Sequence, residues 1–361
     1  LETFKACKVA ADEAIRLQRE DVTRGAGAHC DPTYMEALFD ALGADAVKKL
    51  GADVGPKTLG ELSKNFTADA LKDLQAELGD GKAVKTWLTD VCDGKPAELK
   101  KLRDAFGSMA AVKTVAAQAF GGKTKTIGAL LKTGFGGDPA PLKDFIDGFP
   151  NPDPEALKRK DPAALKAQKD QKDLSDLLTQ GGLNDNPEVF AHLVGTGCEG
   201  KAQGIKDLHA KFSGSTPPGL AGMKALLDTA GLKVPPQRLA EILATGCAGD
   251  AENLKELAIG FDGKMPQLKE MADTWGDDTG PALKKLTSPR HLRGNYQALQ
   301  KKFAQKLNQA FPGSGNEARR KALMKEAPNF ARTVLEDDEN SQLDRPLELD
   351  EDDVGTFKDT D

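Results

Sequence analysis

The sequence has few aromatic residues and no long hydrophobic run. Phe, Trp and Tyr together make up 5% of the 361 residues, whereas charged residues make up 29%. This composition suits thin, largely exposed layers of structure better than a thick globular core. A membrane span needs a run of about 18 or more apolar residues, and none occurs. The formal net charge of −6 gives no global attraction to nucleic acid.

Cysteine is also scarce, with five residues and no CxxC spacing. Cys92, Cys198 and Cys247 recur at one place in a repeated pattern. Equivalent places in stacked helical repeats lie roughly 10 Å apart, whereas a disulfide needs Cα atoms within about 7 Å. We therefore expect these three to be buried, unpaired thiols. Cys7 and Cys30 lie outside the pattern and could be bridged, which leaves the redox compartment open.

One helix face is copied six times along the chain. Its pattern is an apolar residue, two residues, an apolar residue, three residues and an aromatic residue. The copies are Leu59/Leu62/Phe66, Leu99/Leu102/Phe106, Leu142/Phe145/Phe149, Ile205/Leu208/Phe212, Leu254/Leu257/Phe261 and Tyr296/Leu299/Phe303. Successive closing aromatics are 40, 43, 63, 49 and 42 residues apart. Supersecondary units that stack into solenoids repeat over this range.

Each copy is the third helix of a predicted three-helix unit. A first helix ending in glycine precedes it, as at Leu71–Gly79 and Leu268–Gly276, because glycine suits the left-handed residue that closes a helix. A second apolar stripe at helical spacing lies between the two, as at Val84, Leu88 and Val91. Strand signals are nearly absent. We predict an all-α protein, a right-handed α-solenoid of about six three-helix repeats with helical end caps.

The same pattern predicts the domain organisation. An N-terminal helical cap covers residues 1–33, the repeat array 34–303, a basic C-terminal helical cap 304–335, and an acidic tail, disordered or surface-bound, 336–361. An insertion at 150–172 accounts for the long step of 63 residues. We expect it to be a projecting loop with short helices at Pro154–Arg159 and Pro162–Lys169.

Candidate chemistry is sparse. His192, Cys198 and His209 could suggest zinc, but comparison of the repeats places both histidines at variable positions, which we expect to face solvent. The GFGG segment at 134–137 follows a helix rather than a strand, so it predicts a turn and not a phosphate loop. No nucleophile has a matched base. The sequence therefore predicts no enzyme, no metal and no cofactor.

Over about Tyr34–Phe303 the chain resembles the armadillo and HEAT class of α-solenoids in period, in the glycine-closed first helix and in the apolar third helix. Armadillo proteins commonly hold extended peptides along the third-helix surface with a ladder of asparagines; the corresponding positions here include one, Asn65. The resemblance implies a protein partner. Ile146 and Ile259 break the polar pattern on those helices and could anchor such a partner, unless neighbouring loops cover them.

Three functions follow as hypotheses. The favoured one is a non-enzymatic scaffold or adaptor that binds another protein through its helical surface. The second is nucleic-acid binding through a basic block. That block comprises Arg290, Arg293, Lys301, Lys302, Lys306, Arg319, Arg320, Lys321 and Lys325. The third is a secreted effector or toxin component that targets a host protein. The sequence begins at Leu1, so a leader is neither predicted nor excluded, and localisation and oligomeric state stay open.

Overall fold

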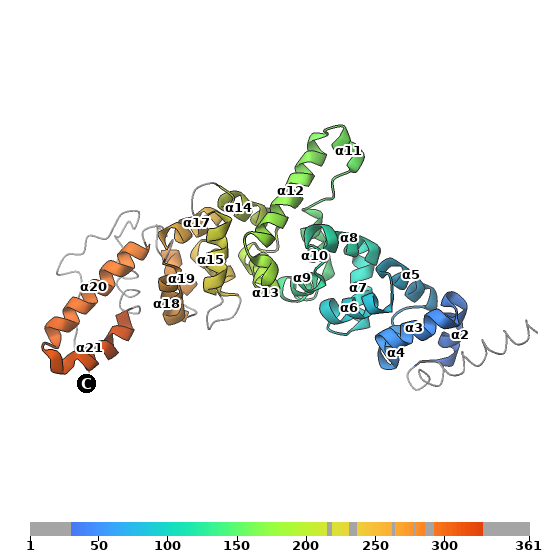
Figure 1. The fold of residues 1–361 in the computed structure, drawn as a ribbon, viewed down its shortest axis with the longest axis horizontal. Coiled ribbons are helices and arrows are strands. Elements are labelled where there is room, and N and C mark those ends of the chain that lie inside the picture. Colours follow the sequence, from blue (N-terminus) through green and yellow to red (C-terminus); the bar gives the residue numbers. More distant parts are fainter. Residues whose placement is uncertain are drawn as a thin grey trace, which may run out of the picture. The chain divides into compact units, whose positions relative to one another are not determined.

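The computed structural model describes residues 30–214, 219–230, 237–261, 264–276, 279–285 and 292–327. Throughout these ranges the secondary structure is helical and contains no strand, which confirms the predicted all-α class (Figure 1). None of the helices in these ranges is long and apolar enough to cross a membrane. The chain divides into two compact units, Leu1–Ile146 and Asp147–Asp361.

The first unit is a succession of short helices whose ends follow the capping residues of the sequence. Asp31 begins α2 by accepting a hydrogen bond from the Thr33 N–H (2.7 Å), and Gly43 ends it at φ 82°. Thr67 and Gly79 bound α5 in the same way. The helices are α2 (Pro32–Leu42), α3 (Ala44–Val54), α4 (Pro56–Ser63), α5 (Ala68–Leu78), α6 (Gly81–Cys92), α7 (Pro96–Phe106), α8 (Met109–Ala119), α9 (Thr124–Ala129) continued by the π-helical turn η1 (Leu130–Gly134), and α10 (Pro139–Asp147), which runs to the unit boundary.

Helices three elements apart pack against each other in this unit. α2 contacts α5, α5 contacts α8, α3 contacts α6, and α6 contacts α9. Leucines at helical spacing fill these contacts, because one apolar stripe on each helix needs a neighbour to cover it. The fully buried leucines include Leu38, Leu50, Leu59, Leu62, Leu71, Leu74, Leu99 and Leu102.

The second unit repeats this packing. α14 contacts α17, α17 contacts α20, α15 contacts α18, and α13 contacts α16. The elements are α11 (Pro154–Lys158), α12 (Pro162–Thr179), η2 (Leu183–Asp185), α13 (Pro187–His192) with η3 (Leu193–Gly197), α14 (Ala202–Phe212), α15 (Leu220–Ala230), α16 (Arg238–Glu241) with η4 (Ile242–Gly246), α17 (Ala251–Gly260), α18 (Met265–Trp275), α19 (Thr279–Lys285), α20 (Leu292–Ala310), η6 (Ser314–Asn316), α21 (Glu317–Leu323) and η7 (Met324–Glu326).

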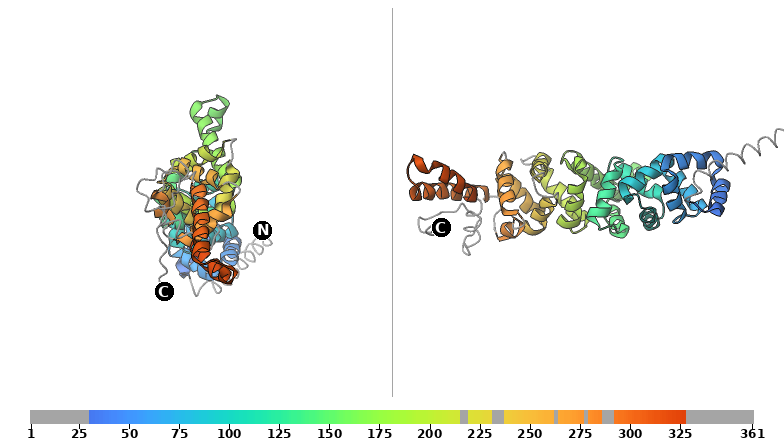
Figure 2. Two further views of the ribbon diagram at one scale, coloured as in Figure 1. Left: turned by 90° about the vertical axis from the view of Figure 1, so that its left-hand side faces the viewer. Right: turned by 90° about the horizontal axis from the view of Figure 1, so that it is seen from below.

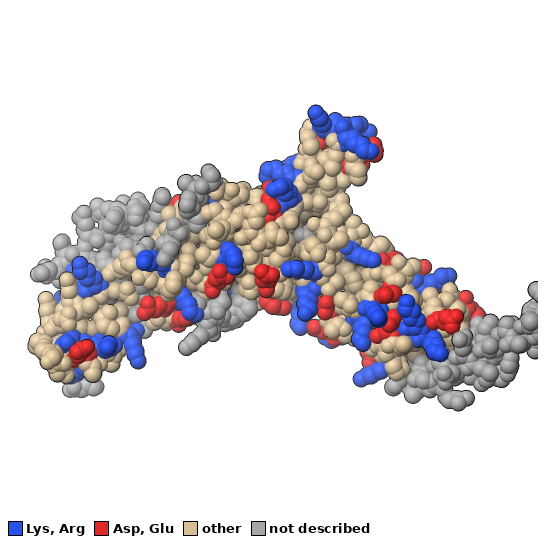
Figure 3. Space-filling model, in the orientation of Figure 1, with Lys and Arg blue, Asp and Glu red and all other residues tan. Residues whose placement is uncertain are grey.

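The predicted insertion forms an arm whose outer end, α11 and the start of α12, stands clear of the other helices of the second unit (Figures 1 and 2). Its inner end contacts α14. The expected helix at Pro162–Lys169 is longer than predicted. α12 continues without a break to Thr179 and so includes the start of the next predicted helix. Asp161 starts α12 by accepting from the Ala163 N–H (2.8 Å). Lys and Arg side chains gather at the end of the arm (Figure 3), where Leu165 is exposed.

The cysteines and closing aromatics largely follow the sequence. Cys92, Cys198 and Cys247 are buried free thiols, as predicted. Cys30 is also a buried free thiol, and Cys7 lies outside the described residues. The closing aromatics at 66, 149, 212, 261 and 303 are buried. Phe106 is only half-buried.

Candidate functional site

Four turns, which follow α6, η1, η3 and η4, resemble one another in sequence and backbone geometry. They have the sequences CDGK (92–95), FGGD (135–138), CEGK (198–201) and CAGD (247–250). Each closes a helix end with two hydrogen bonds: in the second turn, the Phe135 N–H donates to the Leu130 carbonyl five residues back (2.9 Å), and the Gly137 N–H donates to the Leu131 carbonyl six residues back (2.7 Å). The second and third residues of each turn are left-handed.

Three of these left-handed positions are held by residues other than glycine. Asp93 has φ 50°, and Glu199 and Ala248 both have φ 54°. A non-glycine side chain in this conformation costs about 1–3 kcal/mol, and such strain concentrates at functional sites. Among the described residues the remaining example is Lys160, in the arm. The left-handed non-glycine residues make these turns candidate functional positions.

In the first unit, a glycine brings two of the turns together. A Cβ built on Gly128 of α9 would lie 1.9 Å from the Asp90 carbonyl oxygen of α6, so only glycine allows this approach. The Thr124 hydroxyl donates to the Asp90 carboxylate (2.7 Å) beside it. The end of η1 consequently lies next to the end of α6, and the 135–138 turn faces the 92–95 turn.

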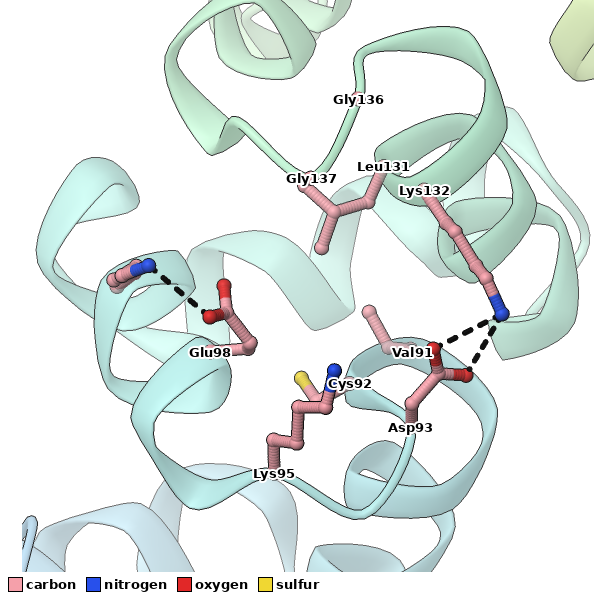
Figure 4. A pocket seen from close by; sticks show the side chains of 10 residues that line it. Val91, Cys92, Asp93, Lys95, Glu98, Leu131, Lys132, Gly136 and Gly137 are labelled. Carbon is pink, nitrogen blue, oxygen red and sulfur yellow. Dashed lines mark hydrogen bonds and ion pairs between the residues drawn. The ribbon is translucent and has the colours of Figure 1, made fainter.

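A first cleft of about 400 Å³ lies between these two turns (Figure 4). The lining residues Cys92 and Leu131 are buried, and Gly137 presents backbone opposite them. Charged side chains form the rim. Lys132 pairs with Asp93 (Nζ to Oδ2, 3.0 Å), although both side chains are more than half exposed.

The remaining rim charges are Glu98, Lys101 and Lys95. Lys101 pairs with Glu98 (3.0 Å). Lys95 is exposed and lines the same cleft, and its ammonium makes no hydrogen bond or ion pair with any described residue. The first cleft thus carries one cation that has no partner.

A second cleft, of about 320 Å³, occupies the equivalent place in the second unit. Here the 247–250 turn faces the 198–201 turn. A Cβ on Gly197 would lie 3.6 Å from the Ala240 Cα, in a close approach of η3 to α16. Lys201 pairs with Glu199 (2.5 Å), and the Gln203 amide donates to the Asp207 carboxylate (2.8 Å).

The two clefts correspond position by position. Cys198, Glu199 and Lys201 match Cys92, Asp93 and Lys95, and Ala248 and Gly249 match Gly136 and Gly137. Three rim positions differ in charge. Gly204 stands where the first cleft has Glu98. Ala244 stands where the first cleft has Lys132, and Asp207 stands where it has Lys101.

The cleft thiols are poor nucleophiles. Burial, reinforced by the charges of Glu98 and Asp93, raises the pKa of Cys92 to about 12. Burial, reinforced by Asp207, raises the pKa of Cys198 to about 12 as well. Because the thiolate is the reactive form, both side chains stay protonated and act as small apolar groups.

The structure distinguishes between the alternatives for Ile146 and corrects one expectation about a histidine. Ile146 of α10 is 5% exposed, so it is covered and does not present an apolar anchor to solvent. Ile259 is half-buried. His209 was expected to face solvent, but its exposed fraction is 7%. Its Nδ1 lies 3.5 Å from the carboxylate of Asp173, in the helix α12, which is longer than predicted. His192 is half-buried.

No group of three or more His, Cys, Asp or Glu side chains in the described part of the chain could hold a metal ion. The described side chains around His209 therefore do not form a metal site. Burial lowers its pKa, against the opposing charges of Asp173 and Asp176.

The basic block is partly committed to holding the C-terminal helices together. Arg320 donates to the carbonyls of Phe311 and Gly313 (2.5 and 2.8 Å), and the Arg319 guanidinium lies over the Phe311 ring (4.2 Å). Lys301, Lys321 and Lys325 are exposed, and Lys302 and Lys306 are half-buried. Arg290 and the side chain of Arg293 lie outside the described residues. Nucleic-acid binding stays a prediction.

The cleft residues were not predicted from the sequence, although the signal is present. The tetrapeptides CDGK and CEGK alternate with FGGD and CAGD along the chain, and this alternation marks both clefts. No protein-family model, curated protein or solved structure matches the chain.

Proposed function

We propose that this chain is a non-enzymatic adaptor, a right-handed α-solenoid of about six three-helix repeats that binds segments of another protein in clefts between successive turns. The packing of helices three elements apart, found in both units, supports the solenoid. It agrees with the resemblance to the armadillo and HEAT class, whose repeats also use an extended surface for binding.

The observation that carries the proposal is the duplication of the cleft. Two units each contain one cleft built from matching residues. Their volumes lie within or near the range of about 300–1,000 Å³ found for small-molecule sites, but those sites are mainly lined by hydrophobic and aromatic side chains. None of the residues lining either cleft is aromatic, and both rims carry charges of both signs.

A polypeptide segment fits this chemistry better than a small apolar ligand does. Gly137, which is half-buried, and Gly249, which is exposed, have no side chain to keep a peptide main chain away from the cleft. The rim offers carboxylates and ammonium groups to its side chains. The pKa of the buried thiols keeps them protonated, which supports binding rather than reaction.

A random dodecapeptide library displayed on phage tests the proposal. We expect peptides enriched on the wild-type chain to lose binding to Lys101→Trp, which places an indole over the first cleft, or to Gln203→Trp, which does so at the second. Lys100→Trp is the matched control, because Lys100 and Lys101 are adjacent exposed lysines of α7, each paired with one carboxylate, and only Lys101 lines the cleft.

Two results would contradict the proposal. One is a library from which no peptide is enriched on the wild-type chain. The other is a set of peptides that bind Lys101→Trp, Gln203→Trp and Lys100→Trp equally well. Circular dichroism of each variant shows whether the helices are retained.

A further inference from the structure

The two clefts have the same construction but different charges at the rim. In the first cleft, Lys132 of η1 reaches across and pairs with Asp93 (3.0 Å). Asp93 pairs with this lysine and not with Lys95, two residues further along its own turn, and Lys95 has no partner among the described residues. The cleft therefore exposes an ammonium group that is ready to accept an anion.

The second cleft has no lysine at the position of Lys132. Ala244 occupies the place of Lys132. Glu199, the counterpart of Asp93, pairs instead with Lys201, the counterpart of Lys95, at 2.5 Å. The cation of the second cleft is thus neutralised by its own turn.

We propose that the first cleft selects acidic polypeptide segments through Lys95, and that Lys132 sets this preference by holding Asp93 away from it. The inference rests on the proposed function and names the ligand class of one of its two sites. The second cleft prefers neutral or basic segments.

The sum of charges around each cleft points the same way. The first rim has Lys95, Lys101 and Lys132 against Asp93 and Glu98, and so carries one excess cation. The second has Lys201 against Glu199 and Asp207, and so carries one excess acid. Complementary charge steers and orients a partner.

The choice of an acidic polypeptide over nucleic acid follows from the number of unpaired cations. A strongly salt-dependent nucleic-acid site makes about 6–10 phosphate contacts. The first cleft offers one unpaired ammonium beside two carboxylates, which repel a phosphate backbone but leave room for one aspartate or glutamate side chain.

Fluorescein-labelled peptides from the dodecapeptide selection give the test. We expect peptides that occupy the first cleft to be enriched in Asp and Glu, and Lys95→Gln to weaken their binding about two- to fivefold, as the loss of one exposed charge pair does. Lys132→Ala should weaken binding to a similar extent, although it leaves Lys95 in place, because Asp93 is then free to pair with Lys95.

Lys100→Ala is the matched control for Lys132→Ala. Both lysines are exposed, and each forms an ion pair with an exposed aspartate, Lys100 with Asp104 and Lys132 with Asp93. Only Lys132 lines the cleft, so Lys100→Ala should leave the dissociation constant unchanged.

A gain of binding completes the experiment. In a Lys95→Gln background, the double change Glu199→Asp and Ala244→Lys rebuilds the arrangement of the first cleft in the second. We expect it to free Lys201 and restore binding of acidic peptides, about two- to fivefold above the Lys95→Gln chain.

The outcomes separate this inference from the proposed function. Peptides that depend on the clefts but are not acidic, or acidic peptides that Lys132→Ala does not weaken, would overturn the inference and leave the adaptor function standing. Binding of a single-stranded RNA oligonucleotide through Lys95 with no acidic peptide enriched would also overturn it. A library that yields no cleft-dependent peptide would overturn both.

Discussion

Replacement of Gly128 by alanine tests how the first unit is packed and how its cleft is formed. Gly128 lies in α9, where the helix meets the last turn of α6. A Cβ there would lie 1.9 Å from the Asp90 carbonyl oxygen and 3.0 Å from the Val91 Cα. Both are backbone atoms, so no flexible side chain can move aside, and the two helices must separate.

The expected magnitude is the difference of two opposing effects. Alanine in place of glycine inside a helix contributes about 1 kcal/mol of stability through helix propensity. Overpacking of a close contact costs about 1–3 kcal/mol, and a backbone clash belongs at the upper end of that range. We therefore expect Gly128→Ala to lower the free energy of unfolding of the first unit by about 1–2 kcal/mol.

Gly51→Ala is the matched control. Gly51 lies inside α3 of the same unit, and the nearest atom to a Cβ there is the Leu59 Cδ2 at 3.8 Å, an ordinary contact. The same substitution should raise the free energy of unfolding by up to about 1 kcal/mol.

Urea unfolding with tryptophan fluorescence measures both changes. The chain has two tryptophans, Trp87 in α6 of the first unit and Trp275 in α18 of the second. In a Trp275→Phe background the signal reports only the first unit. A Gly128→Ala chain as stable as Gly51→Ala would refute the close approach of α9 to α6 and, with it, our account of the first cleft.

Two further predictions concern titratable groups. Burial lowers the pKa of His209 below the value of about 6.5 that it has in the unfolded chain. Between these two pKa values the unfolded state binds more protons, so the free energy of unfolding falls as the pH drops below about 6.5. Urea unfolding between pH 7 and 5 should show a smaller fall in this free energy for His209→Gln than for the wild type, and an equal fall would contradict this role. The pKa values of Cys92 and Cys198 are raised to about 12. Iodoacetamide at pH 8 should therefore alkylate both thiols far more slowly in the native chain than in urea, as followed by mass spectrometry. Equal rates would show that the thiols are not buried.

The helices were predictable because their signals are local. Gly43, Gly79 and Gly276 end first helices as the sequence indicates, since a positive φ at a helix end depends on one residue. The length of α12 was missed for the opposite reason. No glycine or proline interrupts the chain between Pro162 and Thr179, so the insertion and the following helix join into one.

Burial of individual residues was harder to predict because it depends on the neighbouring helix. Ile146 and His209 occupy positions whose counterparts in other repeats are polar or variable, yet both are buried. His209 is covered by α12. An ion pair between Asp170 of α12 and Lys206 of α14 (2.5 Å) joins these two helices. The insertion exists once in the chain, so comparison between repeats carried no information about the surface that it covers.

The clefts were missed because the pairing of their charges differs between tetrapeptides of nearly the same sequence. Nothing in the CDGK tetrapeptide indicates that Asp93 pairs with Lys132, many residues further along, whereas Glu199 of CEGK pairs with Lys201 of its own turn. The sequence shows the alternation of the tetrapeptides, but the pairing of one turn with the next requires the packing of α6 against α9.

The left-handed positions of the cleft turns hold glycine, alanine or an acidic residue. Gly136 has φ 62° at the place where Asp93 has φ 50° and Glu199 has φ 54°, so glycine can form this turn without the Cβ strain. Any side chain other than glycine there costs about 1–3 kcal/mol, and Ala248 has the same φ of 54°. Asp93 ends α6 through its backbone N–H, which donates to the Leu88 carbonyl, so its exposed carboxylate takes no part in the cap. What the two acids do is pair with a rim lysine, from the facing turn in the first cleft and from the same turn in the second. Because those pairs are exposed, each returns at most about 1 kcal/mol. Ala248 adopts the same conformation without a charge, so the strain alone does not assign the carboxylates a role, and the proposed control of cleft charge is tested by Lys132→Ala.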